Sequence, residues 1–490
     1  MTSGNLGGAL LLLIACALPV FAGGCSEETE APAVSMNPWL SGQRLRARLR
    51  EGGGTSIFLG WVDSELDTAC EFLPDDSGVL HCMPITHDNS GAFADADCSE
   101  RLALYYGSDL CPAPPDGVPE FVTLTLEPRP QTCAGELARS GVWRRGAAYG
   151  GEVYFLSDLG CLLGGPNDSA YELGEPVDAV TFVSAKLEEV PFDTGLAARR
   201  ILAADGAEQT IAVIDQTLET PCLGYLEDYV SAYDDRCVAG HTELVTGQLP
   251  FSDAACTEVA NVAPLWEEPE GCPPRDRLLV FGEAVGCESS FEVREVGAVL
   301  PASISLYDTS GDGSCELESP AEAYLEQGAL IPPESLPRLA SRFVGDGTLQ
   351  ARAWVDAEGA VMMLLGSQFH DAQADQDCAL YEIDGSLRCV AGRGDEGVYL
   401  DDACTEPVVP VYEGCTDPPQ TGVVIRTTDN CAVVGHAYAV GAAVPTPATL
   451  YTSVAGSPCT EATVNAAATY HELGDELPAS TFPEVREFVE

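Results

Sequence analysis

The eight residues FSDAACTE, at positions 251–258, decide the architecture because the same pattern occurs twice more in the chain. It reads FADADCSE at positions 93–100 and YLDDACTE at positions 399–406. The shared features are an aromatic residue, an aspartate two positions later, a cysteine three positions after that, and then Ser or Thr followed by Glu. Internal similarity at three well-separated places predicts three tandem copies of one structural unit.

The cysteines follow the same threefold pattern. Cys16 and Cys25 lie near the N-terminus, and the other 18 of the 20 cysteines divide into three sets of six. In each set the fifth and sixth cysteines are 28 positions apart, and an aspartate lies seven positions before the first cysteine. These aspartates are Asp63, Asp215 and Asp371. The sets are Cys70, Cys82, Cys98, Cys111, Cys133, Cys161; Cys222, Cys237, Cys256, Cys272, Cys287, Cys315; and Cys378, Cys389, Cys404, Cys415, Cys431, Cys459.

Cysteines of this number and spacing indicate structural disulfides rather than zinc sites. The chain has no CxxC pair and only six histidines, whereas zinc sites need closely spaced ligands. We therefore expect an oxidising compartment, no metal and no other cofactor. Sequence does not fix the pairing within a set of six; our hypothesis joins the first cysteine to the second, the third to the fourth and the fifth to the sixth.

Local patterns favour β-strands throughout the chain. Leu45, Ala47 and Leu49 alternate with the arginines of positions 44–50, as in a strand with one apolar and one basic face. Asp384 and Gly385 lie between two apolar segments and predict a tight hairpin turn. Amphipathic helices are scarce, and only residues 320–327 suggest a short one. The predicted fold class is all-β.

The strand-like segments number about eight to ten per repeat, enough for two four-stranded sheets. Our leading hypothesis is therefore a six-bladed β-propeller with two blades per repeat, because ring closure removes exposed sheet edges. The alternative is three consecutive β-sandwich or barrel domains, since the repeat length is ordinary for a domain. The predicted segments are a signal peptide over 1–24, a flexible tether over 25–42, and repeats over 43–192, 193–338 and 339–490.

The N-terminus has the features of an export signal. A short apolar run from Leu10 to Val20 is followed by Ala22, two glycines, Cys25 and then polar residues. This ending resembles the lipobox of bacterial lipoproteins, which implies acylation of Cys25 as the mature N-terminus. Ala22 stands where that family usually has Leu, and no Lys or Arg precedes the apolar run. Acylation of Cys16, or secretion without a lipid, are the alternatives.

The charge of the chain limits its partners. With 77 acidic and 23 basic residues, the net charge of −54 repels the phosphates of nucleic acids, so nucleic acid is not an expected partner. No second apolar stretch approaches the length of a transmembrane helix. We therefore expect contact with a membrane only through the N-terminal lipid.

Few residues suggest catalysis or metal binding. The histidines show no ligand-like or triad-like spacing; they are His81, His87, His241, His370, His436 and His471. Asp308, Ser310 and Asp312 resemble the opening of a calcium loop, but Ser319 stands where that loop needs Glu, so an acidic turn is favoured. We therefore predict no catalytic, cofactor-binding or metal-binding residues.

Two repeated sets of aspartates have a simpler interpretation. Asp63, Asp215, Asp371 and Asp95, Asp253, Asp401 recur with the scaffold, so we expect them to accept backbone hydrogen bonds in turns, with a repeated calcium site as the alternative. The arginine face of residues 44–50 is expected to neutralise nearby acids, with a partner-docking strip as the alternative.

As a whole, the repeat resembles the uncharacterised cysteine-rich repeats of predicted bacterial lipoproteins. This resemblance implies a location in the cell envelope but no activity. The sequence therefore predicts an exported, lipid-anchored protein of the bacterial cell envelope, on the outer membrane or outside the cell. Its leading function is a non-enzymatic scaffold that binds an envelope protein or a glycan. The alternative is an extracellular polysaccharide hydrolase or lyase on a propeller scaffold.

Overall fold

The computed structural model of the protein describes residues 38–85, 92–104, 120–126, 137–157, 160–166, 170–193, 195–223, 235–239, 242–245, 250–265, 276–281, 291–301, 304–309, 315–317, 323–356, 358–391, 398–412, 420–427, 433–445, 449–452, 459–462, 464 and 468–490. Within these ranges the chain forms β-strands and three short 3-10 helices, without an α-helix. The predicted all-β class is confirmed. The 3-10 helices are η1 (Ala179–Thr181), η2 (Pro333–Ser335) and η3 (Ala479–Thr481).

Each repeat begins with an antiparallel meander that contains its first two cysteines. The strands of the first meander are β2 (Leu45–Gly52), β3 (Thr55–Asp63), β4 (Thr68–Pro74) and β5 (Leu80–Pro84). Those of the second are β14 (Leu196–Ala203), β15 (Glu208–Asp215) and the short β16 (Thr220–Pro221), continued by a single bridge from Cys222 to Ala239. Those of the third are β25 (Leu349–Val355), β26 (Val361–Asp371), β27 (Gln376–Ile383) and β28 (Ser386–Ala391).

Strand register aligns the three meanders residue by residue. Leu45 faces Asp63 across the first hairpin, as Leu196 faces Asp215 and Leu349 faces Asp371. This alignment shows that the pattern Leu-x-Ala-Arg begins all three first strands, at residues 45–48, 196–199 and 349–352. The three leucines are at most 1 % exposed, so this pattern fixes the apolar face of each first strand in the core.

A final strand ends each repeat, directly after its 3-10 helix. These strands are β13 (Ser184–Asp193), β24 (Ala340–Val344) and β36 (Glu484–Val489). The chain that enters each one passes beside the second cysteine of its own repeat. The amides of Cys82, Cys237 and Cys389 donate to the carbonyls of Val183, Pro337 and Pro483, at 2.9, 2.9 and 3.1 Å.

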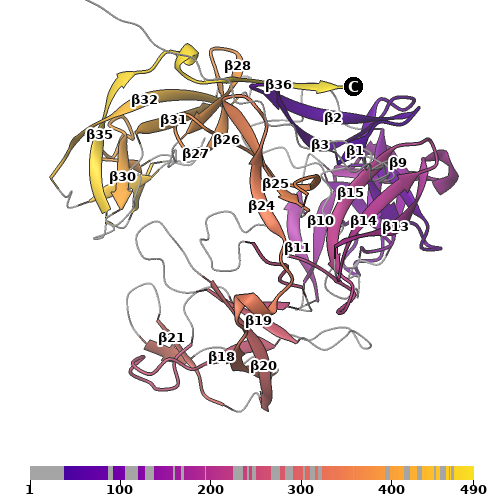
Figure 1. Ribbon diagram of the computed structural model, residues 1–490, viewed down its shortest axis with the longest axis horizontal. Helices are drawn as coiled ribbons and strands as arrows, with labels where there is room; N and C mark the ends of the chain where they lie inside the picture. Colours follow the sequence, from indigo (N-terminus) through magenta and orange to yellow (C-terminus); the bar gives the residue numbers. More distant parts are fainter. Residues whose placement is uncertain are drawn as a thin grey trace, which may run out of the picture. The chain divides into compact units, whose positions relative to one another are not determined.

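The final strands also join one repeat to the next. β13 pairs with β14 and β24 pairs with β25, in each case as two antiparallel strands connected by a short segment of chain. β36, at the C-terminus, pairs with β2, at the start of repeat 1, and lies beside both β2 and β28 (Figure 1). Each meander also meets the final strand of its own repeat, through β5–β13 and β28–β36 pairing in repeats 1 and 3 and through the single bridge Arg236–Arg338 just before β24 in repeat 2. The meanders and final strands therefore form a closed circuit. Six separate propeller blades are not confirmed, because strands here pair across the repeat borders.

The second half of each repeat forms four strands in one order, as a separate sheet in repeats 1 and 2 and as part of the large sheet of the meanders in repeat 3. In repeat 1 the strand order is β7 (Leu102–Leu104), β12 (Ala170–Val177), β9 (Ser140–Ala148), β8 (Phe121–Thr125). The same order recurs as β18 (Val262–Leu265), β23 (Ala323–Leu330), β20 (Phe291–Pro301), β19 (Arg277–Phe281), with β17 (Thr242–Val245) added beside β19. In repeat 3 it is β30 (Val408–Tyr412), β35 (Ala468–Glu476), β32 (Val433–Ala443), β31 (Thr421–Thr427).

Small sheets accompany these larger ones. Repeat 1 has β6 (Ala92–Phe93), β10 (Glu152–Ser157) and β11 (Gly160–Pro166), and repeat 2 has β21 (Tyr307–Thr309) and β22 (Cys315–Leu317). Repeat 3 has β29 (Val398–Tyr399), β33 (Leu450–Thr452) and β34 (Thr460–Ala462). Each of these sheets brings the third and sixth cysteines of its repeat together.

Two disulfides per repeat lie within the described residues, in the same places each time. The first cysteine pairs with the second, as predicted: Cys70–Cys82, Cys222–Cys237 and Cys378–Cys389. The third pairs with the sixth: Cys98–Cys161, Cys256–Cys315 and Cys404–Cys459. The hypothesis of third with fourth and fifth with sixth is therefore wrong. The fourth and fifth cysteines lie outside the described residues; they are Cys111, Cys133, Cys272, Cys287, Cys415 and Cys431.

Two local predictions have opposite outcomes. The hairpin at Asp384 and Gly385 is confirmed: both residues have positive φ, 52° and 72°, and Ile383 pairs with Ser386. The short helix suggested over residues 320–327 is wrong, because Ala323–Leu330 form strand β23. Strand pairing prevails over local pattern there, since β23 pairs with β20 on one side and β18 on the other and buries Tyr324 and Leu325.

Candidate functional site

The aspartates that precede the first cysteines hold tight turns. Asp63 is fully buried, and its Oδ1 accepts the amides of Glu65 and Leu66 at 3.1 and 3.3 Å. Asp215 and Asp371 accept the amides two and three residues further on in the same way, at 2.8 to 3.3 Å. These bonds agree with the backbone-accepting role expected from the sequence.

The second set of aspartates holds the loop that carries the third cysteine. Asp95 accepts the amides of Ser99 and Glu100, at 2.9 and 2.8 Å, and the Ser99 hydroxyl at 2.6 Å. Asp253 and Asp401 accept the equivalent amides and threonine hydroxyls. Hydrogen bonds from the Glu100 amide and the Ser99 hydroxyl hold the pKa of Asp95 below its ordinary value. The motif quoted first is thus a self-contained turn that positions a disulfide, with the cysteine at positive φ in all three copies.

A calcium site built from these two sets receives no support from the geometry. No group of three or more His, Cys, Asp or Glu side chains that could hold a metal ion occurs among the residues described. The carboxylates face backbone amides instead, as the bonds above show. Of the loop resembling a calcium site, residues 310–314 lie outside the described ranges.

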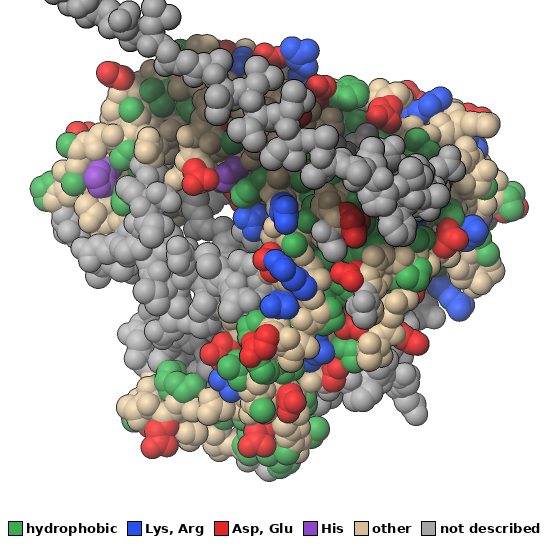
Figure 2. Space-filling view, viewed as in Figure 1, with side chains coloured by type: hydrophobic (Ala, Val, Ile, Leu, Met, Phe, Trp, Pro, Cys, Tyr) green, Lys and Arg blue, Asp and Glu red, His purple; other side chains and the backbone are tan. Residues whose placement is uncertain are grey.

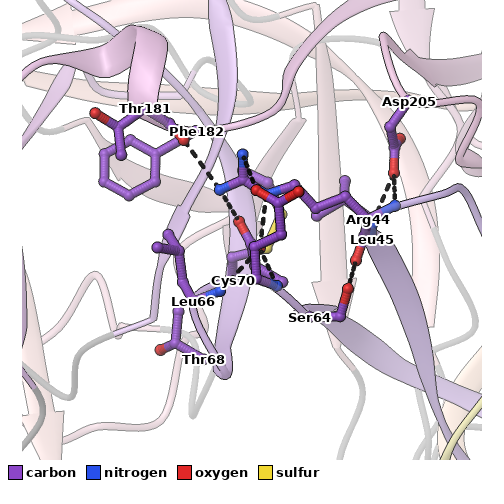
Figure 3. Close-up of polar contacts among 12 residues, drawn as sticks. Arg44, Leu45, Ser64, Leu66, Thr68, Cys70, Thr181, Phe182 and Asp205 are labelled. Atoms are coloured by element: carbon purple, nitrogen blue, oxygen red, sulfur yellow. Dashed lines mark hydrogen bonds and ion pairs between the residues drawn. A yellow bond between two sulfur atoms is a disulfide. The ribbon is translucent and has the colours of Figure 1, made fainter.

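Arg44 is the centre of a polar cluster that occurs in repeat 1 alone among the described residues. Its Nε and Nη2 each donate to a carboxylate oxygen of Asp63 at 2.7 Å, and Nη2 also donates to the Thr181 carbonyl at 3.0 Å. The Arg44 amide donates to Asp205, from the turn of the second repeat (Figure 3). The hydrogen bond and charge of Asp63 outweigh burial and raise the pKa of Arg44. Gly195 and Thr348 occupy the equivalent positions, so Asp215 and Asp371 lack this arginine.

Two of the three other arginines of the first strand pair with one acid of β36, Glu487. Arg48 and Arg50 contact the two carboxylate oxygens of Glu487 at 2.7 and 2.6 Å, whereas Arg46 donates to the Gln43 carbonyl at 3.3 Å. The expectation that this face neutralises nearby acids is thus met by Glu487. Acidic and basic side chains are also intermixed on the face displayed in Figure 2.

The described histidines are engaged in local contacts. His370 is 8 % exposed, stacks on Phe343 with ring centroids 3.9 Å apart, and contacts Asp377 and Asp375 at 2.9 and 3.4 Å. His81 lies 3.4 Å from both the Phe182 carbonyl and Asp75. The Nδ1 atoms of His436 and His471 contact Glu476 and the Gly441 carbonyl. His87 and His241 lie outside the described residues.

A cavity of about 380 Å³ is the best candidate for a binding site. It is lined by Trp39, by residues 53–56 in the β2–β3 turn and the start of β3, and by residues 344–347 from the end of β24 into its connection with β25. Val361 and Leu364 of β26 complete the lining. Trp39 belongs to β1 (Trp39–Leu40), which pairs with β15. The cavity therefore lies where the first hairpin of repeat 1 meets the β24–β25 junction of repeats 2 and 3, and it includes a strand that the sequence placed at the end of the flexible tether.

This cavity was missed at the sequence level. Its glycines, Gly53, Gly54, Gly345 and Gly347, lie outside the cysteine pattern, and the paired turns they form are far apart in sequence. The available signal was the run of three glycines at 52–54, which no other repeat contains.

The predicted lipidation site, Cys25, and its alternative, Cys16, lie outside the described residues. The described part of the chain contains no helix that could span a membrane.

The fold and cysteine pattern define a class: an all-β, disulfide-crosslinked protein built from three repeats whose strands pair in a closed circuit. The chain belongs to a family of unknown function, DUF7481, whose sequence profile matches residues 61–482. That match spans all three cysteine sets but stops short of β2 and β36, the strands that close the circuit. No curated protein and no solved structure matches the chain.

Proposed function

We propose that this protein is an exported, lipid-anchored component of the bacterial cell envelope that acts as a non-enzymatic binding scaffold for a glycan or an envelope protein. The observation that carries the proposal is a threefold, disulfide-crosslinked framework in which the cavity beside Trp39 departs from the threefold pattern. Regular repetition stabilises a framework, whereas a departure from it marks a place where a distinct ligand can bind.

The disulfides support the proposed location. Bridges at equivalent places in all three repeats form and persist in oxidising surroundings such as the periplasm or the cell surface. The net charge of −54 keeps an exposed protein soluble and away from anionic polymers.

The composition of the cavity supports binding over hydrolysis. Hydrolysis of a glycosidic bond ordinarily uses two carboxyl groups on opposite sides of the bond. Among the described residues that line the cavity, Asp346 is the only acid. A single carboxylate beside apolar and backbone groups is suited to holding a ligand.

The anchor is tested by expressing the full precursor in a bacterial host and separating membrane from soluble fractions. Wild type should partition with the membrane, and mass spectrometry should show an acylated Cys25 at the mature N-terminus. Cys25→Ser should move the protein to the soluble fraction, whereas Cys16→Ser should leave it on the membrane. A mature N-terminus other than Cys25 would contradict the anchoring proposal.

A further inference from the structure

We infer that the cavity beside Trp39 binds a neutral saccharide, one or two sugar rings in size. This inference rests on the proposed binding function and specifies its ligand. The volume of about 380 Å³ lies within the range of small-molecule sites.

The charge of the lining excludes anionic ligands. No Lys, Arg or His is among the described residues that line the cavity, and exposed Asp346 adds a negative charge at its wall. A phosphate or a carboxylate sugar would face repulsion there without a cation to offset it. A neutral sugar is instead attracted, because its hydroxyls donate well to a carboxylate.

The lining also offers the mixture of surfaces that a sugar ring presents. Trp39, Val361 and Leu364 provide apolar contact for the C–H face of a ring, and Ser56 provides a hydroxyl. Trp39 is 6 % exposed, and its indole N–H has no hydrogen-bond partner among the described residues. This N–H is buried from solvent, so Trp39 contributes apolar contact to the cavity rather than a hydrogen bond.

Glycine turns let a ligand approach the backbone closely. Gly54 has a φ of 87°, and a Cβ added to it would meet no atom within 4 Å. Gly206 has the equivalent place in the β14–β15 turn, with a φ of 94° and the same open surroundings. The β14–β15 turn is longer than the β2–β3 turn, and only Gly54 lines the cavity, so Gly206 is a control for the effect of a side chain at an open turn position with positive φ.

The equivalent junction between repeats 2 and 1 is filled rather than open. There the Asp205 carboxylate enters the space beside the first strand and accepts the amides of Arg44 and Leu45, at 2.9 and 2.7 Å. In the β2–β3 turn, Gly53 and Gly54 bring no side chain to that space. The turn backbone packs closely on the start of β25 instead, where a Cβ on Gly53 would meet the Leu349 amide nitrogen at 2.8 Å, and only Gly54 faces open space.

The test uses the mature, oxidised chain and saturation-transfer NMR with calorimetry against glucose, galactose, mannose, N-acetylglucosamine and their disaccharides, with glucuronate as the anionic comparison. We expect at least one neutral sugar to bind and glucuronate to bind at least tenfold more weakly. Gly54→Asn, tolerated at positive φ, should weaken the neutral sugar at least tenfold by occupying the cavity mouth. Gly206→Asn should change its affinity less than twofold, and Asp346→Asn should weaken it several-fold.

The outcomes separate this inference from the proposed function. If Gly54→Asn binds the sugar as tightly as wild type does, the sugar binds elsewhere and the inferred site is wrong. The proposed glycan-binding function would still stand. Equal binding of glucuronate would overturn the neutral class. If no sugar binds, the inference fails, whereas the anchored scaffold is still judged by its acylated Cys25 and its capture of an envelope protein.

Discussion

The three junctions between repeats use the same strand pairing but differ in how the chain connects them. At two junctions, β13 with β14 and β24 with β25, the paired strands follow each other along the chain. At the third, β36 pairs with β2 from the opposite end of the sequence. The first two are local hairpins, whereas the third must be closed by contacts alone.

Equivalent arginines show how each junction is supported. Arg48, Arg199 and Arg352 share one register position in the first strands. Arg199 pairs with Glu189 at 2.7 Å, and Arg352 lies over the Phe343 ring at 4.8 Å. Arg48 shares Glu487 with Arg50.

The closing junction has further contacts. Ser41 donates to the carboxylate of Glu490 at 2.6 Å, and the Glu490 amide donates to the Ala47 carbonyl at 3.1 Å. The junction without a covalent link is thus held by ion pairs and hydrogen bonds from several side chains. Joining distant parts of a chain costs only about 0.6 kcal/mol for each doubling of the loop, so such contacts can suffice.

The largest effect should follow removal of residues 484–490. The deletion exposes the core face covered by Val485, which is 2 % exposed, and leaves β2 and β28 with unpaired edges. Burial of one valine alone contributes about 1.5–3 kcal/mol, so we expect a loss of at least about 3 kcal/mol in urea unfolding of the mature chain. Deletion of Glu490 alone should cost less than about 1 kcal/mol. Equal urea midpoints for the longer deletion and wild type would show that β36 does not close the circuit.

Arg44 should have the next largest effect, because it fixes the start of β2 where the other junctions have a chain connection. Arg44→Leu leaves the buried Asp63 without its bidentate partner. Hydrogen bonds to charged groups contribute about 1.5–3 kcal/mol, and we expect a destabilisation of about 2 kcal/mol by urea unfolding. Arg46→Leu, two residues along the same strand, is the matched control and should change stability by less than about 0.5 kcal/mol. Similar losses in both variants would contradict a special role for Arg44.

Glu487 should give a smaller effect that depends on pH. Burial alone raises its pKa, but hydrogen bonds from Arg48 and Arg50 outweigh burial and lower the pKa below its ordinary value. A carboxyl with a lowered folded-state pKa contributes stability above its unfolded pKa, about 4.3, and loses it as the pH falls through the folded value. Glu487→Gln should therefore cost about 0.5–1 kcal/mol at pH 7, and the difference from wild type should shrink toward pH 3.

The control for this pair is Glu189→Gln, at a junction that the chain already connects. Glu189 contacts one arginine and is more exposed than Glu487, 42 % against 29 % for the side chains. We expect its replacement to cost less than about 0.5 kcal/mol at pH 7. A pH-independent cost for Glu487→Gln would show that packing, and not charge, explains its effect.

Much of the framework could be predicted from the sequence because it repeats. The aspartates, the third-cysteine motif and the hairpin at Asp384 depend on contacts within a few residues, which local patterns reveal. The pairing of Cys98 with Cys161 could not be predicted from local patterns. It depends on the pairing of β6 with β10, two strands that are far apart in the sequence. The sequence of β36 does not identify β2 as its partner, because every edge strand offers the same unpaired backbone groups.

The candidate site was harder to predict than the framework for a physical reason. Trp39 follows a polar, proline-containing segment and was assigned to the tether, and only its pairing with β15 places it in the core. The glycines that line the cavity leave space because they lack side chains. Glycine residues carry no functional group, so the sequence there does not indicate a binding site. Departures from a repeat are visible in sequence only after the register of the repeat is known.

The smallest effect is expected from a circular permutant that exchanges the two kinds of junction. A Gly/Ser linker would join Glu490, whose carboxylate contacts Ser41, to Pro38 just ahead of β1, so that the buried Trp39 is kept, and the new ends would be Leu196 and Asp193. The β36–β2 junction would then be covalent, and the β13–β14 junction, with its Glu189–Arg199 pair, would close the circuit. If the junctions are equivalent, the permutant should keep both disulfides per repeat seen here, by peptide mapping, and differ from wild type by less than about 1 kcal/mol in urea. A permutant opened between β3 and β4, inside a meander, should lose more, because the buried turn at Asp63 would be cut. Failure of the first permutant with survival of the second would show that the hairpin junctions are required for folding and that the terminal junction forms afterwards.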